Sequence, residues 1–214
     1  MAPDFDPSDD LTDVADGLQP VTVKRPGGSE STEVPHALRR AVRTREVEDS
    51  NGRYTAGDVA WHLPASELAA PPRPGDVIVD ADGRRFTLLD VQQTVLGSRW
   101  RCVARNLAVV HGLDTYVDVE RATATKGTAG AERATWHIWR SGLAARIQPA
   151  ESAVTNRHDR RTTNARFKVF LAQDLDLDHT HRIKGPDGTI YRILACRKAE
   201  RIDSLAEIDV IRAG

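Results

Sequence analysis

The 214-residue sequence is poor in the residues that build many binding sites and covalent scaffolds. It has two cysteines, one methionine and 5% aromatic residues. Cys102 and Cys196 are too few for a disulfide framework, and no CxxC pair is present that could start a cysteine zinc site. Because aromatic rings are scarce, we expect a core built mainly of Val, Leu, Ile and Ala.

Long apolar runs and an excess of charge of one sign are also missing. No run of about 18 apolar residues exists, so we expect no membrane span. The first residues combine no basic region with an apolar segment, which predicts no signal peptide and a reducing, soluble compartment. Thirty basic residues nearly balance 31 acidic ones, for a formal net charge of −1. This balance gives no global basic field and disfavours a general nucleic-acid binder.

The sequence contains none of the common catalytic or metal-binding motifs. GxSxG, P-loop and GxGxxG patterns are absent, and neither Ser141 nor Cys102 has a base at a recognisable spacing. His179 and His181 could share a metal if they lay in a strand, but no third ligand spacing supports this, so a surface pair is favoured. The acidic run 174–178 lacks the glycine and the late glutamate of a calcium loop. We therefore predict a protein that is not an enzyme and uses no cofactor or metal.

Short strands separated by Gly and Pro turns dominate the chain. Residues 76–79 and 86–89 flank Asp82-Gly83, which is typical of a tight hairpin turn. Residues 21–25 alternate apolar and polar, as half-buried strands do. Helical signal is weak: residues 34–42 fit either two helical turns or an extended strand, and residues 66–68 fit a short turn.

The second half of the sequence repeats the order of the first. Residues 117–121 resemble residues 21–25, and Pro186-Asp187-Gly188 precedes a strand as Asp82-Gly83 does. This parallel predicts two copies of one small unit. We predict an all-β fold of two tandem small antiparallel β-barrels, or barrel-like sandwiches, with little helix. The expected bounds are an acidic arm at 1–17, a first barrel at 18–112 and a second at 113–214.

Three segments are candidates for contact with partners. Residues 156–166 are rich in arginine and polar residues, which predicts a loop that meets phosphates or an acidic surface, or else a solvated loop. Trp136, Trp139 and Arg140 lie close together in the sequence, and such residues often anchor interfaces, although core packing explains the tryptophans equally well. Residues 39–45 form a second arginine-rich stretch, for which a solvated surface is favoured.

The segment 1–17 contains six aspartates and neither Lys nor Arg. Such a composition predicts a disordered tail. As a functional hypothesis, the arm, with Asp9 and Asp10 at its centre, lies on an arginine-rich surface of a neighbouring subunit. Deletion of residues 1–17 should then weaken assembly.

Over residues 115–214 the order of these motifs resembles the tailed-phage head-closure family, also called head-tail joining or stopper proteins. The resemblance rests on the strand end Arg146-Ile147-Gln148-Pro149, the polar arginine-rich loop that follows it, and the hairpin Asp187-Gly188-Thr189-Ile190-Tyr191. A typical member of the family has one barrel, whereas two are expected here. The first half is similar to β-barrel neck proteins as well, but less specifically.

The resemblance implies a virion protein at the head-tail junction, made in the bacterial host cytoplasm. It implies a homo-oligomeric ring, twelve-fold or six-fold, below the portal or its adaptor and above a tail terminator or tail-completion protein. The loop 150–164 would project into the channel and help to retain packaged DNA, with Arg157, Arg160 and Arg161 facing it. The alternatives are a tail-completion or tail-terminator protein at the same junction, and a two-barrel nucleic-acid-binding module.

Overall fold

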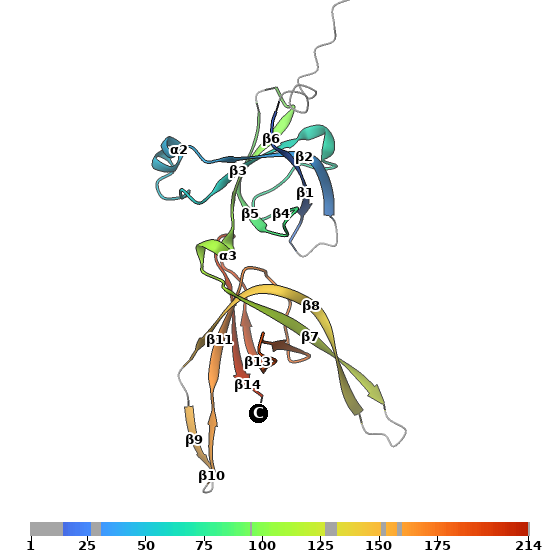
Figure 1. The fold of residues 1–214 in the computed structure, drawn as a ribbon. Coiled ribbons are helices and arrows are strands. Elements are labelled where there is room, and N and C mark those ends of the chain that lie inside the picture. The colour runs from blue at the N-terminus through green and yellow to red at the C-terminus, as the bar shows by residue number, and fades with distance from the viewer. Residues whose placement is uncertain are drawn as a thin grey trace, which may run out of the picture. The chain divides into compact units, whose positions relative to one another are not determined.

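The fold is described from a computed structural model, in which residues 15–26, 31–94, 96–126, 132–150, 153–157 and 160–213 are described. The chain divides into two compact units, the first comprising Met1–Val110 with Arg201–Asp203 and the second comprising His111–Glu200 with Ser204–Gly214. Strands dominate both units (Figure 1). Among the described residues no helix is both long enough and apolar enough to cross a membrane.

The first unit contains a closed antiparallel barrel in the strand order β1-β2-β3-β6-β5-β4. Its strands are β1 (Leu18–Lys24), β2 (Ser31–Ala41), β3 (Val59–Pro64), β4 (Val77–Asp80), β5 (Arg85–Gln93) and β6 (Arg99–Arg105). A six-residue helix α2 (Thr44–Asp49), the 3-10 turn η1 (Ala65–Glu67) and the four-residue helix α3 (Leu107–Val110) complete this unit.

Alternation of apolar side chains along these strands fills the first barrel. Trp61, Leu63, Ile78 and Leu88 are fully buried, and Trp61 packs edge-on against Phe86 with ring centroids 5.6 Å apart. A second, smaller cluster lies on the other face of the wall, where Val42, Ala60 and Val103 pack with half-buried Val47 and Tyr54. The α2 region therefore covers part of the barrel exterior.

The second unit contains another closed antiparallel barrel, in the order β11-β14-β13-β12-β7-β8. Its strands are β7 (Thr115–Lys126), β8 (Glu132–Pro149), β11 (Arg166–Leu171), β12 (His181–Lys184), β13 (Ile190–Arg197) and β14 (Ala206–Arg212). A separate two-stranded sheet, β9 (Ala153–Arg157) with β10 (Arg160–Asn164), lies between β8 and β11 in the sequence. Val119, Val169, Ile183 and Ile208 are fully buried inside the barrel.

The two barrels have the same cyclic strand order. If the six strands of each barrel are counted in chain order, both close as first-second-third-sixth-fifth-fourth. The repeat expected from the sequence is thus present in the topology. The predicted fold class, all-β with two tandem antiparallel barrels and little helix, is confirmed.

Three local expectations are resolved by the structure. Residues 34–42, for which the sequence left helix and strand open, are extended within β2 up to Ala41. Within the segment 150–164, expected to be a loop, residues 153–157 and 160–164 pair as the strands β9 and β10 instead. Its threonines at 155, 162 and 163 favour strand backbone, because branching at Cβ suits extended conformations. The turn predicted at 66–68 corresponds to η1.

Candidate functional site

The strands β7 and β8 continue beyond the second barrel as a long hairpin arm (Figure 1). Within the barrel, β7 also pairs with β12 through residues 118–121, and β8 also pairs with β11 through residues 145–149. From Ala122 to Lys126 and from Glu132 to Trp136 the two strands pair only with each other among the described strands. The backbone N–H of Ala122 donates to the carbonyl of Thr180 at 2.8 Å. Beyond Ala122 the distal arm presents strand edges that pair with no other described strand and can pair with another chain.

The predicted interface residues Trp136, Trp139 and Arg140 lie at the base of this arm. Both tryptophans are half-buried and Arg140 is exposed. The guanidinium of Arg182 lies 4.3 Å from the ring centroid of Trp136, and that of Arg140 lies 4.4 Å from the centroid of Trp139. Both geometries are those of cation–π contacts. An interface role for the three residues remains a prediction.

Buried polar groups hold the base of the arm to the barrel. Glu120 on β7 is buried and accepts a 2.5 Å hydrogen bond from Nε of Arg182 on β12. The ring of His181 lies 5.0 Å from that of Trp139, and its Nδ1 is 2.8 Å from an oxygen of Asp178. Hydrogen bonds from Thr180 and His181 hold the pKa of the Asp178 carboxyl well below its usual range. The arm is thus tied to β12 through both charge and aromatic packing.

Of His179 and His181, for which the sequence favoured a surface pair over a shared metal, only His179 lies at the surface. His181 is buried and its Nδ1 is engaged by Asp178, whereas His179 is exposed in the preceding turn. In the acidic run 174–178, Leu175 and Leu177 are partly buried and pack against the core. No group of three His, Cys, Asp or Glu side chains that could hold a metal occurs in the described ranges.

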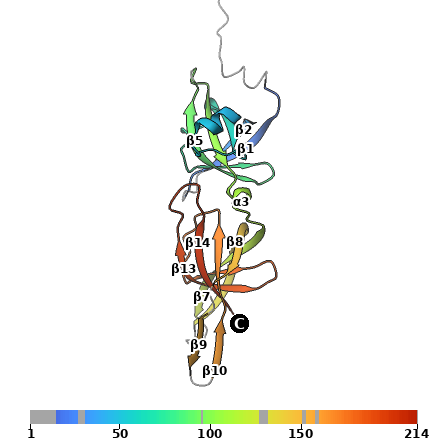
Figure 2. The same cartoon turned by 90° about the vertical axis from the view of Figure 1, so that its left-hand side faces the viewer.

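The predicted DNA-facing residues Arg157, Arg160 and Arg161 belong to the β9–β10 hairpin. Arg157 is the register partner of Arg160, and Asn156 is the partner of Arg161. The hairpin pairs with no other described strand and extends beyond its barrel in both views (Figures 1 and 2). Two adjacent register pairs of one projecting hairpin therefore carry the three arginines. Their contact with DNA remains a prediction. The other two predicted interface residues, Asp9 and Asp10, lie outside the described residues.

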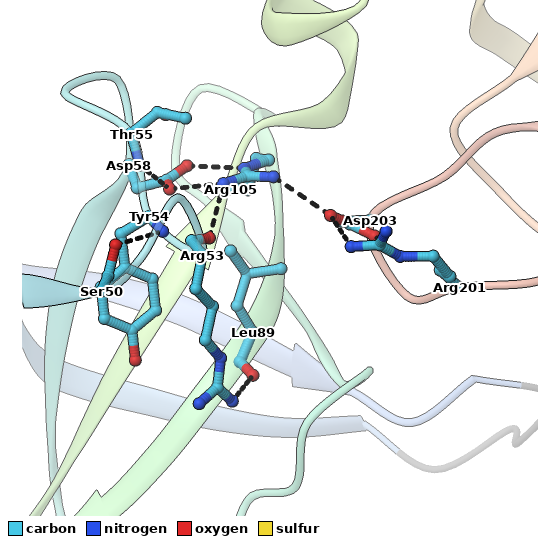
Figure 3. Close-up of polar contacts among 9 residues, drawn as sticks. All are labelled: Ser50, Arg53, Tyr54, Thr55, Asp58, Leu89, Arg105, Arg201 and Asp203. Atoms are coloured by element: carbon cyan, nitrogen blue, oxygen red, sulfur yellow. Dashed lines mark hydrogen bonds and ion pairs between the residues drawn. The ribbon is translucent and has the colours of Figure 1, made fainter. Parts of the chain in front are cut away.

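The first unit contains a buried ionic centre that sequence reasoning missed (Figure 3). Arg105 at the end of β6 is 7% exposed and Asp58 is 1% exposed. Nε and Nη2 of Arg105 each donate a 2.8 Å hydrogen bond to the Asp58 carboxylate. These bonds raise the pKa of Arg105. This fork-to-fork geometry is the strongest form of an arginine-carboxylate pair.

The ionic centre organises the loop before β3. Nη2 of Arg105 also donates to the carbonyl of Arg53 at 3.0 Å, and the backbone N–H of Thr55 donates to Asp58 at 2.8 Å. Nη1 donates to Asp203 at 3.3 Å (Figure 3). Asp58 and Arg105 are separated by 47 residues, so no local spacing in the sequence could reveal the pair. Its role in the structure is to fix this loop, not to present a reactive group.

Two known groups of virion proteins are similar to parts of this chain. The model of the family described as "Phage Head-Tail Attachment protein" matches residues 1–104. A solved chain from "Virion of native gene transfer agent (GTA) particle" is similar, with 14% identity and a TM-score of 0.37, over 46% of this chain and 93% of that chain. No curated protein matches the sequence.

The family match covers the first barrel, whereas the resemblance drawn from the sequence rested mainly on residues 115–214. The predicted recognition is nevertheless confirmed, because both lead to proteins that join phage heads to tails. The first 104 residues of the chain are thus similar to the phage head-tail attachment family.

Proposed function

We propose that the protein is a ring-forming subunit of the phage neck that closes the head after DNA packaging and offers a docking face to the tail. The match of residues 1–104 to the head-tail attachment family carries this proposal. In this role the protein is a structural component of the virion. Its partners are further copies of itself, a portal or adaptor protein on the head side, and a tail terminator or tail-completion protein on the tail side.

Open strand edges support assembly into a closed ring, with twelve or six copies. The distal β7–β8 arm and the β9–β10 hairpin both have edges unpaired with other described strands. Contacts between different surfaces of identical subunits close into a ring when the rotation between neighbours divides a full turn. Pairing of an arm edge with a neighbouring subunit would supply such a contact.

In the assembled ring, the β9–β10 hairpin faces the channel and its arginines contact packaged DNA. Arg157, Arg160 and Arg161 lie close together in register on a ribbon that projects from the barrel. Arginine contacts to phosphates hold DNA without reading its sequence, which suits a channel that must retain any packaged end.

Electron microscopy of particles from cells that lack the gene tests the neck assignment. Head closure predicts empty or leaking heads beside free, complete tails. Filled heads beside tails of aberrant length would assign the protein to tail completion instead. Normal particles would refute the neck assignment, leaving a two-barrel nucleic-acid-binding module to be tested by DNA binding.

Replacement of the hairpin arginines tests the DNA contact separately. Particles carrying Arg157→Ser, Arg160→Ser and Arg161→Ser should assemble but retain less nuclease-protected DNA, and the loss should grow with salt concentration. The matched control replaces three exposed arginines elsewhere: Arg45, Arg73 and Arg192. Equal DNA retention in the two triple variants would refute the contact while leaving the neck assignment intact.

A further inference from the structure

One outer side of the first barrel carries a basic face for which the proposed function has no use. It consists of Arg40 on β2, His62 on β3, and Arg99 and Arg101 on β6, and we call it the basic face. His62 is the register partner of Arg101, and Pro64 is the partner of Arg99. Because Trp61 and Cys102 belong to the inner core, alternation along the strands places His62 and Arg101 on the outside.

The positive charge of this face is only partly compensated. Arg101 donates a 2.6 Å hydrogen bond to Glu46 of α2. Arg40 and Arg99 form no ion pair with another described residue. Burial lowers the pKa of His62, and the charges of Arg99, Arg101 and Arg40 lower it further. Its Nδ1 is buried without a hydrogen-bond partner in the described structure. The face therefore suits an anionic ligand.

The start of β1 lies in the same row of register partners as two residues of the basic face. Leu18 pairs with Leu38, Leu38 with His62, and His62 with Arg101. At about 4.8 Å between neighbouring strands, Leu18 lies roughly 10 Å from His62 and roughly 14 Å from Arg101 along this row. Leu18 directly follows the acidic segment, residues 1–17, which contains six aspartates and no basic residue.

The chain is long enough for the acidic segment to reach the face. Five residues, from Asp13 to Leu18, span up to about 17 Å when extended. A tethered segment of this length has an effective concentration in the millimolar range, which favours it over a free competitor of equal affinity. Charge complementarity and the tether therefore point to the same occupant.

We propose that residues 4–16 bind the basic face of their own barrel, with their aspartates against Arg40, Arg99 and Arg101. The contact is electrostatic and lies at the surface, so salt weakens it. It is independent of ring formation and of the hairpin arginines. It revises the hypothesis that the acidic segment 1–17 lies on a neighbouring subunit, because the strand register places the start of β1 close to the basic face of its own barrel.

Pulsed electron paramagnetic resonance distance measurement tests the proposal in the full-length chain. Spin labels are attached at Ser8→Cys and Gln92→Cys, since Gln92 is exposed and is the register partner of Arg101. Cys196→Ser removes the half-buried native thiol, and buried Cys102 stays unlabelled. Tenfold dilution with unlabelled protein removes distances between copies.

A bound segment gives a narrow distance distribution, whereas a free ten-residue segment samples end-to-end distances of about 17 Å with a wide spread. We expect a narrow distribution that broadens severalfold in 1 M salt and in the Arg40→Ser, Arg99→Ser variant. The control variant, Arg73→Ser with Arg192→Ser, removes the same charge elsewhere and should keep it narrow.

Three results would overturn the proposal. The first is a broad distribution in the parent chain. The second is a narrow one that the Arg40→Ser, Arg99→Ser variant leaves unchanged. The third is a narrow distance that disappears on dilution, which would assign the segment to a second copy. If the parent distribution is broad and duplex DNA protects the basic face from arginine modification, the occupant is DNA instead.

Discussion

Removal of the Arg105 side chain should destabilise the first barrel more than any exposed arginine substitution. The Asp58 carboxylate accepts three hydrogen bonds, two from Arg105 and one from the backbone of Thr55. Arg105→Ala removes the two charged donors and leaves a carboxylate that is 1% exposed with one neutral donor. At about 1.5–3 kcal/mol for each hydrogen bond to a charged group, the loss is about 3–6 kcal/mol. Removal of one partner of a buried ion pair costs a similar ~3–5 kcal/mol of stability.

Removal of Asp58 together with Arg105 should restore part of the lost stability. Most of the cost comes from the unpaired Asp58 charge, so the double variant Asp58→Ala, Arg105→Ala should be more stable than Arg105→Ala alone. Because each barrel has its own core, the measurement should follow each barrel by hydrogen exchange during urea unfolding.

Barrel-resolved exchange should report lower protection in β3 and β6 and unchanged protection in the second barrel. Arg73→Ala, an exposed arginine in the same unit, is the control and should change stability by less than about 0.5 kcal/mol. The reasoning fails if Arg105→Ala costs less than about 1 kcal/mol, or if the double variant is no more stable than the single one.

Three further predictions rest on single sites. Gly188 has φ +80°, and no atom lies within 4 Å of an added Cβ. Gly188→Ala should therefore lower the free energy of unfolding by about 1–2 kcal/mol through backbone strain alone, as measured by urea unfolding. An unchanged free energy of unfolding would contradict this explanation. Burial raises the pKa of Cys102 to about 12, so in the native Cys196→Ser variant no thiol should react with a maleimide at pH 8, whereas one should react after unfolding. Lys168 lowers the pKa of Glu207, so this carboxylate stabilises the fold above its unfolded pKa and the gain is lost as pH falls through the folded value. Glu207→Gln should therefore lower the free energy of unfolding at pH 7 and reduce its fall below about pH 4.5. An unchanged dependence of this free energy on pH would refute the contribution of Glu207.

Turn chemistry was the most reliable guide to the fold. Asp82-Gly83 and Asp187-Gly188 were both expected to end strands, and both glycines adopt positive φ in the structure. Among the aromatic residues, Trp61, Phe86 and Tyr191 are buried in the cores, and Phe167 is half-buried against the second core. These features depend on local backbone preference and on alternation, which a single sequence displays directly.

The residues 34–42 were ambiguous for a physical reason. Val34, Ala37 and Leu38 are buried, a spacing typical of a helix. In the structure the three steps from Val34 to Ala37 on β2 lie opposite two steps, from Val21 to Gln19, on β1. The extra residue on β2 changes its phase, so that Val34 and Ala37 both face the core. A β-bulge of this kind depends on the partner strand, and the period of one segment cannot reveal it.

Candidate sites could be found only where their residues are close in the sequence. Trp136, Trp139 and Arg140 stood out by proximity, but their partners Arg182 and His181 lie on another strand, more than 40 residues away. The Arg105–Asp58 pair had no local signal of any kind. Long-range pairs such as these are fixed by strand order, which only the folded barrel supplies.

The connection between the second and third strands carries a different element in each barrel. Between its second and third strands, the first barrel carries α2 and the loop that Arg105 fixes, which cover the outside of the wall. At the corresponding position, between β8 and β11, the second barrel carries the β9–β10 hairpin. The same strand order thus supports an element that covers the wall in one barrel and a projecting hairpin in the other. That connection is the place to graft a segment from a related barrel without disturbing either core.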